Sequence, residues 1–152
     1  MEYVFESKIG NLKIMVKEGK IVSLQVCSDE ISKSEIKEKL VQSAINQLDE
    51  YFEGKRTTFS LPLNPKGTPF QKRVWSELIK IPYGKTVSYQ DIAIKLGNKN
   101  LTRAVGGANN KNPIIILIPC HRVIGKNGNL TGFACGVEIK EKLLKLEKFN
   151  KD

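Results

Sequence analysis

The sequence is poor in the residues that build metal and disulfide scaffolds. It contains three cysteines, Cys27, Cys120 and Cys135, with no CxxC pair, and a single histidine, His121. This set offers too few soft ligands for a structural zinc site, and an odd number of cysteines does not make a disulfide framework. We therefore expect no bound metal. Each thiol is either a small core residue, as we expect for Cys27, or a reactive group.

Long hydrophobic runs are also missing. The longest aliphatic run covers residues 114–118, whereas a helix that spans a membrane needs about 20 apolar residues. The opening segment MEYVFESKIG lacks the basic and apolar regions of a signal peptide. These absences predict a protein without membrane association and with a cytoplasmic location.

Charge is unevenly distributed along the 152 residues. Residues 1–64 carry nine Lys and Arg against ten Asp and Glu, whereas residues 65–152 carry sixteen against six. A basic half of this kind favours a polyanionic partner, most often nucleic acid, although a merely lysine-rich surface is an alternative. The 40% apolar content suffices for a core. We expect two domains, 1–64 and 65–152.

The first half has the pattern of a small α/β domain. Alternating apolar residues between 3 and 16 predict a β-hairpin, and residues 21–26 predict a third strand. Ser32 and Glu35 fit a capping box, which opens a predicted helix that ends at Gly54. The expected unit is therefore β-β-β-α.

The second half opens with three short predicted helices. Thr68 and Gln71 cap the first, Ser88 and Asp91 cap the second, and the third covers about 101–108. The second and third helices, joined by a turn with a glycine, match a helix-turn-helix motif, with an ordinary helical hairpin as the alternative.

The third helix is unusual for a reader of base sequence. Arg103 is its only charged residue between 101 and 110, and most of its other side chains are small. Small residues permit a close approach to a surface but supply few contacts to base edges. We therefore expect minor-groove and backbone contacts with weak sequence specificity.

The chemistry-bearing residues follow the aliphatic run, which we expect to form a buried strand. Cys120, His121 and Arg122 come directly after it, and positive neighbours favour the thiolate form of a cysteine. This pattern predicts a nucleophilic thiol. The alternative is a buried cysteine beside a histidine that faces solvent.

The motifs SYQDIA, TRAVGGA and IPCHRV, in this order, resemble the O6-alkylguanine-DNA alkyltransferase family, also called methylated-DNA–protein-cysteine methyltransferases. The resemblance extends from Phe70 to Glu147. It implies a ribonuclease-H-like N-terminal α/β domain and a winged-helix-turn-helix C-terminal domain that carries the active site.

The resemblance also implies a mechanism. Cys120 would take the alkyl group from guanine O6 and keep it as a thioether, so that each molecule acts once. His121 would deprotonate the thiol through a water and would be oriented by Glu147. Tyr89 would donate a hydrogen bond to the departing purine. No cofactor is implied.

Further roles follow from the same resemblance. Arg103 would replace the extruded nucleotide in the duplex, since a stacked base cannot reach a buried thiol. We expect a monomer that binds double-stranded DNA carrying O6-alkylguanine, and O4-alkylthymine is a further possible substrate. The other expected DNA contacts are Thr102, Gly106, Gly107, Tyr89 and Lys126, and the expected substrate pocket comprises Val123, Phe133, Ala134, Cys135, Asn112 and Phe70.

Two departures from the family pattern lie in this pocket. Phe133 lacks the phenolic hydroxyl common in relatives, and Cys135 has a side chain where glycine is usual. We expect a narrower pocket that accepts methyl better than bulky groups. Cys135 is also a candidate oxidation partner for Cys120.

Two alternative functions remain at the level of sequence. One is a non-catalytic protein that recognises alkylated DNA on the same fold; the presence of Cys120 argues against it. The other is a cysteine hydrolase, which gives no reason for the basic second half or for the helix-turn-helix motif.

Overall fold

The computed structural model describes residues 1–128 and 136–149. The chain divides into two compact units, Met1–Pro65 and Lys66–Asp152. The described residues contain no helix long and apolar enough to cross a membrane.

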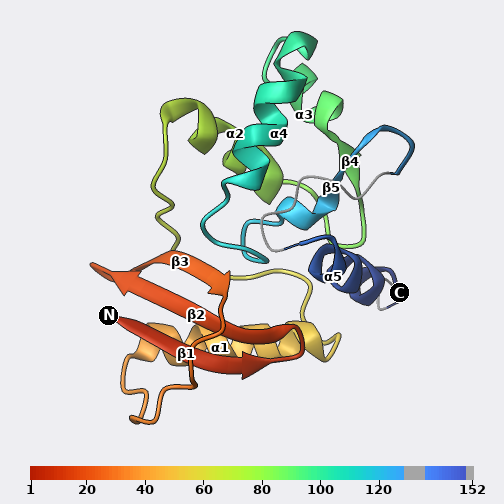
Figure 1. Cartoon of the computed structure of the whole chain (residues 1–152). Helices are drawn as coiled ribbons and strands as arrows, with labels where there is room; N and C mark the ends of the chain where they lie inside the picture. Colours follow the sequence, from red (N-terminus) through yellow and green to blue (C-terminus); the bar gives the residue numbers. More distant parts are fainter. Residues whose placement is uncertain (129–135, 150–152) are drawn as a thin grey trace. The chain divides into compact units, whose positions relative to one another are not determined.

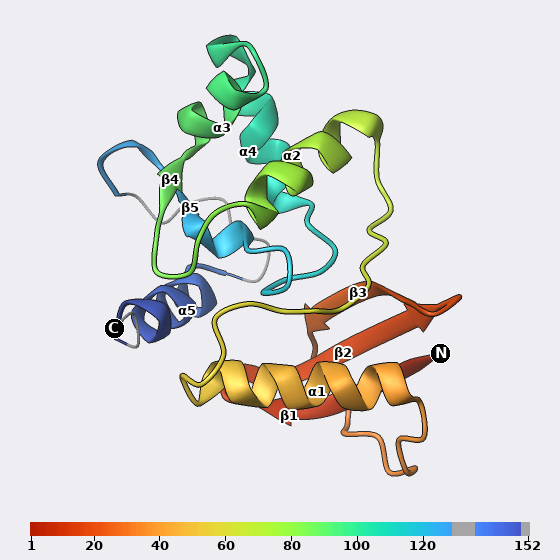
Figure 2. The same cartoon turned by 180° about the vertical axis from the view of Figure 1, so that it is seen from behind.

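The first unit is a three-stranded antiparallel sheet with one helix on a face (Figures 1 and 2). Strands β1 (Glu2–Ser7), β2 (Gly10–Lys17) and β3 (Lys20–Val26) pair in sequence order, and α1 (Lys39–Phe52) lies across the sheet. Leu12 and Ile14 alternate with more exposed residues along β2 and are fully buried, as a sheet with one covered face requires. The predicted β-β-β-α order is confirmed.

The predicted start of the helix in this unit is wrong. Ser32 does not cap a helix, because its hydroxyl accepts from the Val4 N–H (2.9 Å) and its own N–H donates to the Val4 carbonyl (3.0 Å). The edge of β1 therefore uses the polar groups that a capping box needs. Helix α1 begins at Lys39, and its N-cap residue Glu38 makes no side-chain cap hydrogen bond.

The second unit gathers three helices, α2 (Pro69–Ile79), α3 (Tyr89–Lys95) and α4 (Thr102–Asn110), with a 3-10 turn, η1 (Lys99–Leu101), before α4 (Figure 1). Both predicted capping boxes are present, at Thr68 with Gln71 and at Ser88 with Asp91. These caps begin α2 and α3 where the sequence predicts them. Helix α4 follows α3 after a turn that contains Gly97, so the helical pair of the expected motif, α3 and α4, is confirmed.

The aliphatic run at 114–118 is buried as expected, but it is not a strand. It folds into turns, in which Leu117 N donates to Ile115 O (2.8 Å) and Ile118 N donates to Ile114 O (3.0 Å). Ile116 has φ 70, a left-handed conformation that β-branched residues rarely adopt. Asn112 closes the turn by bonding Ile114 N (3.0 Å) and Ile118 O (2.8 Å). These local bonds replace the ladder of a strand.

Two short strands and a last helix complete the second unit. β4 (Val87–Ser88) pairs in parallel with β5 (Val123–Ile124), and the 3-10 turn η2 (Cys120–Arg122) lies directly before β5. A further 3-10 turn, η3, covers Lys126–Gly128, and α5 (Val137–Phe149) packs against η2. The β4–β5 pair places the start of α3 beside the segment that follows Cys120.

Candidate active site

Cys120 begins η2 and is 1% exposed. Its N–H donates to the Ile118 carbonyl (2.7 Å). Its own carbonyl accepts two hydrogen bonds, from the Val123 N–H and from Asn109 Nδ2 (3.4 Å). The peptide groups on both sides of the thiol are therefore fixed by hydrogen bonds.

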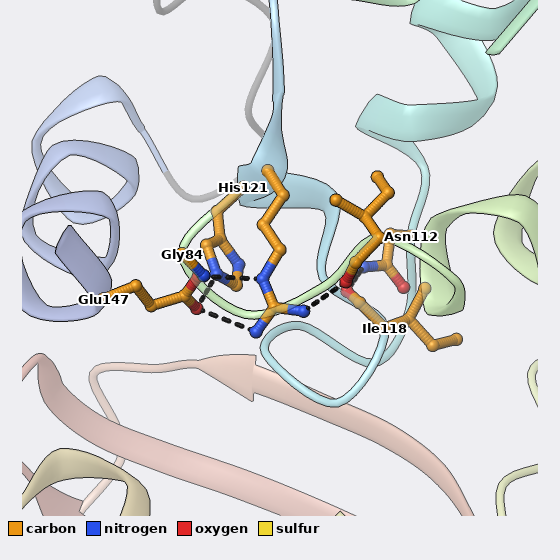
Figure 3. Close-up of polar contacts among 7 residues, drawn as sticks. Gly84, Asn112, Ile118, His121 and Glu147 are labelled. Carbon is orange, nitrogen blue, oxygen red and sulfur yellow. Dashed lines mark hydrogen bonds and ion pairs between the residues drawn. The ribbon is translucent and has the colours of Figure 1, made fainter. Parts of the chain in front are cut away.

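The carboxylate of Glu147 is the centre of a buried polar network (Figure 3). Its Oε2 lies 2.5 Å from His121 Nε2 and 3.0 Å from Arg122 Nη2, while Oε1 accepts from Arg122 Nε (2.8 Å) and from the Gly84 N–H (3.3 Å). Arg122 Nη1 also donates to the Ile81 carbonyl (2.8 Å). The network ties α5 to η2 and to the segment between α2 and β4.

The surroundings of His121 and Glu147 determine the protonation states of these two side chains. Burial lowers the pKa of His121, and this effect outweighs the hydrogen bond to Glu147, which raises it. Burial would raise the pKa of Glu147, but hydrogen bonds and charge from His121 and Arg122 dominate and lower it to about 2. At neutral pH the imidazole is therefore neutral and the carboxylate ionised. His121 Nε2 then carries the proton, and Nδ1 has a lone pair.

Lys140 is a buried lysine beside the expected tyrosine. It is 0% exposed, and its Nζ lies 3.5 Å from Tyr89 Oη and 5.7 Å from the centre of the Tyr89 ring. Burial lowers the pKa of Lys140 to about 8, against an attraction to Cys120 that raises it. Burial, followed by the charge of Cys120, raises the pKa of Tyr89. The ammonium of Lys140 is therefore buried and the phenol of Tyr89 half-buried, and both are within electrostatic range of Cys120.

A cavity of about 700 Å³ lies against α4. Tyr89 lines it and also lines a second cavity of about 260 Å³. The other residues of the larger cavity are Asn100, Thr102, Arg103, Gly106, Gly107 and Asn110, and those of the smaller are Ser88, Gln90, Thr102 and Lys126. Helix α4 therefore presents its small-residue face to open space beside the tyrosine.

The two glycines of α4 are not explained by packing among the described residues. A Cβ at Gly107 would meet nothing within 4 Å, and one at Gly106 would make only an ordinary contact with the Tyr89 ring (3.9 Å). Neither glycine has a positive φ. Glycine inside a helix makes the helix less stable than alanine does. The two glycines therefore indicate a close approach by a partner.

Family models match both units of the chain. Residues 69–149 match the DNA-binding domain of 6-O-methylguanine DNA methyltransferase, and residues 2–65 match the ribonuclease-like domain of that family. The chain belongs to this family. The predicted resemblance is thereby confirmed, as is the fold class, a ribonuclease-like α/β unit joined to a helical DNA-binding domain.

Individual relatives agree over most of their length. The constitutive methylated-DNA–protein-cysteine methyltransferase of Bacillus subtilis is 46% identical over 95% of this chain and 93% of its own. The Methanosarcina barkeri methyltransferase is 56% identical over 74% of this chain and 71% of its own. The structure of the Mycobacterium tuberculosis family member in complex with DNA superposes with a TM-score of 0.88, at 40% identity over 98% and 93% of the two chains.

The structure brings most of the predicted site residues together. Cys120 and His121 lie in η2, and Glu147 of α5 contacts His121. The two cavities are lined by Tyr89 together with the other predicted DNA contacts. Asn112 and Val123 are buried around the thiol segment. Phe70 is the second residue of α2 and is not among the described residues that line either cavity. Phe133, Ala134 and Cys135 lie outside the described residues.

Sequence reasoning missed three residues of the site. Lys140 lies seven residues before Glu147 on α5, which is about two helical turns. This spacing puts the two residues on one face of the helix and is the signal that could have indicated Lys140. The sequence indicates Arg122 only as a positive neighbour of the thiol, whereas in the structure its guanidinium binds both carboxylate oxygens of Glu147. Asn109 gave no signal, because a lone asparagine in a helix has no pattern.

Proposed function

We propose that this chain repairs DNA by moving the alkyl group of an O6-alkylguanine to the sulfur of Cys120, once per molecule. The proposal rests on the buried thiol of Cys120, which is followed in the chain by a buried neutral histidine that the ionised Glu147 holds in place. Relatives named methylated-DNA–protein-cysteine methyltransferases support the same chemistry.

The thiol proton leaves through His121. The lone pair on Nδ1 accepts it, directly or by way of a water, while Glu147 holds Nε2–H and stabilises the imidazolium that forms. Among the described residues, nothing hydrogen-bonds Nδ1, so this atom is available for the transfer. The ammonium of Lys140 stabilises the thiolate because the two charges are opposite.

The displacement then exchanges two bonds. A bond forms between Cys120 Sγ and the alkyl carbon, while the bond from that carbon to guanine O6 breaks and leaves its electron pair on the purine. Tyr89 Oη donates a hydrogen bond to the purine ring as this charge develops, and burial keeps the phenol protonated because it raises the pKa. The thioether has no leaving path, so the reaction stops after one turnover.

Helix α4 would contact double-stranded DNA through the minor groove and the backbone. Gly106 and Gly107 permit close approach, and the exposed Arg103 would fill the space of the extruded nucleotide. Thr102 and Lys126, which line the same region, would contact the backbone. We place this activity in the cytoplasm, at the chromosome.

A stoichiometric transfer assay tests the proposal. The protein is titrated against duplex DNA that carries one O6-[³H]methylguanine, and protein-bound label is counted. We expect label to rise to one methyl per molecule and stop. Tight binding without label would favour the non-catalytic recognition function, and continued turnover would favour a hydrolase.

A further inference from the structure

Asn109 occupies the last turn of α4 and is 0% exposed. Its side-chain Nδ2 donates to the carbonyl oxygen of Cys120 over 3.4 Å. The residue before it is held by a second hydrogen bond, in which Trp75 Nε1 donates to the Ala108 carbonyl (2.9 Å). Asn109 therefore connects a firmly held helix end to the peptide of the nucleophile.

Stability does not account for an amide at this position. Among the described residues, no donor reaches Asn109 Oδ1, and a buried acceptor without a partner costs free energy. The bond on the other side of the amide is long and therefore weak. Val123 N–H also binds the Cys120 carbonyl, so this oxygen keeps a partner without Asn109.

Asn112 provides a contrast within the same segment. Its Nδ2 donates to Ile118 O and its Oδ1 accepts from Ile114 N, so both ends of the amide are used to close the turn. That arrangement explains Asn112 as a stabilising residue. The amide of Asn109 has one partner among the described residues, and that partner belongs to the nucleophile.

We propose that Asn109 is a positioning residue, which fixes the orientation of the Cys120 peptide relative to helix α4. The inference rests on the proposed function. Helix α4 carries the residues assigned to DNA, so the Asn109 hydrogen bond links the surface that holds the substrate to the residue that attacks it. In-line displacement is sensitive to small misplacement of the reacting atoms, whereas deprotonation of the thiol by His121 does not require this bond.

The test compares Asn109→Leu, which keeps the branched shape, with Gln47→Leu as a matched control. Gln47 is a buried amide of the first unit, and it bonds Ser60 at both N–H and carbonyl. Four quantities are measured for each protein: Tm, affinity for unmodified duplex, the saturating single-turnover rate on O6-methylguanine duplex, and the rate at which iodoacetamide alkylates Cys120.

For Asn109→Leu we expect an unchanged or higher Tm, unchanged DNA affinity, an unchanged iodoacetamide rate and a saturating transfer rate lower by about 10-fold or more. For Gln47→Leu we expect the reverse, a lower Tm with an unchanged transfer rate, because its loss leaves Ser60 N–H without that acceptor.

Several results would overturn the proposal. These are an unchanged transfer rate in Asn109→Leu, a parallel loss of the iodoacetamide rate, a loss confined to DNA affinity, or a loss of rate accompanied by a lower Tm. The wild-type arm separates this proposal from the proposed function. If wild type takes up no methyl group, the alkyl-transfer function itself fails; if it does, only the role of Asn109 is at stake.

Discussion

His121 Nε2 lies 2.5 Å from Glu147 Oε2, and both side chains are almost completely buried, at 0% and 1% exposed. The two residues are 26 positions apart and come from η2 and α5. This contact fixes the tautomer of the only histidine in the chain and leaves its second nitrogen to accept a proton.

Glu147→Gln should weaken both stability and transfer. The pKa of Glu147 is about 2 in the folded chain and 4.5 without the fold, so its contribution is complete above pH 4.5 and is lost as pH falls from 4.5 to 2. It amounts to about 3 kcal/mol. Urea unfolding at pH 7 and at pH 3 should show a smaller difference between the variant and wild type at pH 3. An equal difference at both pH values would contradict the buried ion pair.

Lys140→Met should stabilise the protein and slow the reaction. Burial lowers the pKa of Lys140 from 10.5 to about 8, so the unfolded chain binds more protons between these values and wild-type stability rises with pH from 8 to 10.5. The variant should lack this rise and unfold at a higher Tm at pH 7. Its transfer rate should be lower, and the wild-type rate should fall above pH 8 as the ammonium is lost. Identical pH profiles for the two proteins would exclude this role of Lys140.

Gly107→Ala separates helix stability from DNA binding. Nothing lies within 4 Å of the added Cβ, so alanine should raise the free energy of unfolding by about 0.5–1 kcal/mol. Affinity for duplex DNA, measured by fluorescence anisotropy, should fall because the methyl group holds the backbone away. Unchanged affinity would mean that DNA does not approach this face of α4.

Arg103→Ala should affect duplex substrates alone. The exposed side chain lines the cavity beside α4, and its proposed task is to fill the gap that a flipped nucleotide leaves. The saturating rate on duplex O6-methylguanine should fall by about 100-fold, whereas the rate with the free base O6-benzylguanine should not change. Arg56→Ala in the first unit is the control, at an arginine whose side chain is 27% exposed and ion-paired with Glu50. Equal losses on both substrates would assign Arg103 to the chemical step.

Cys135→Gly tests the expected narrow pocket at a position outside the described residues. Single-turnover rates on O6-methylguanine and O6-benzylguanine duplexes should differ in wild type, in favour of methyl. The glycine variant should reduce this difference because it removes a side chain. Equal wild-type rates on the two adducts would refute the expectation.

Local sequence signals predicted much of the fold. The alternation in residues 3–26 and the caps at Thr68 and Ser88 depend on neighbouring residues alone, and the structure has these elements at those places. The errors occurred where a polar side chain binds backbone groups that the predicted element would use. Ser32 pairs with Val4, 28 positions away, and the run at 114–118 turns because Asn112 takes its backbone groups.

The candidate site shows the same division. Cys120 and His121 were predicted from their adjacency, and Glu147 only from the family resemblance, because a glutamate in LLKLEK has no local distinction. The partners of Arg122 and Lys140 depend on how α5 packs against η2 and α3. That packing is a tertiary property, which no spacing in the sequence specifies.

The most direct test of alkyl transfer is the intact mass of the protein after incubation with a duplex that carries one O6-methylguanine, beside a Cys120→Ser control. We predict a gain of about 14 mass units, one methyl group on one sulfur. Peptide mapping should assign this gain to Cys120. The gain should saturate at one methyl group per molecule and be absent from the control. An unchanged mass in wild type, or a methyl group that persists in Cys120→Ser, would contradict the account.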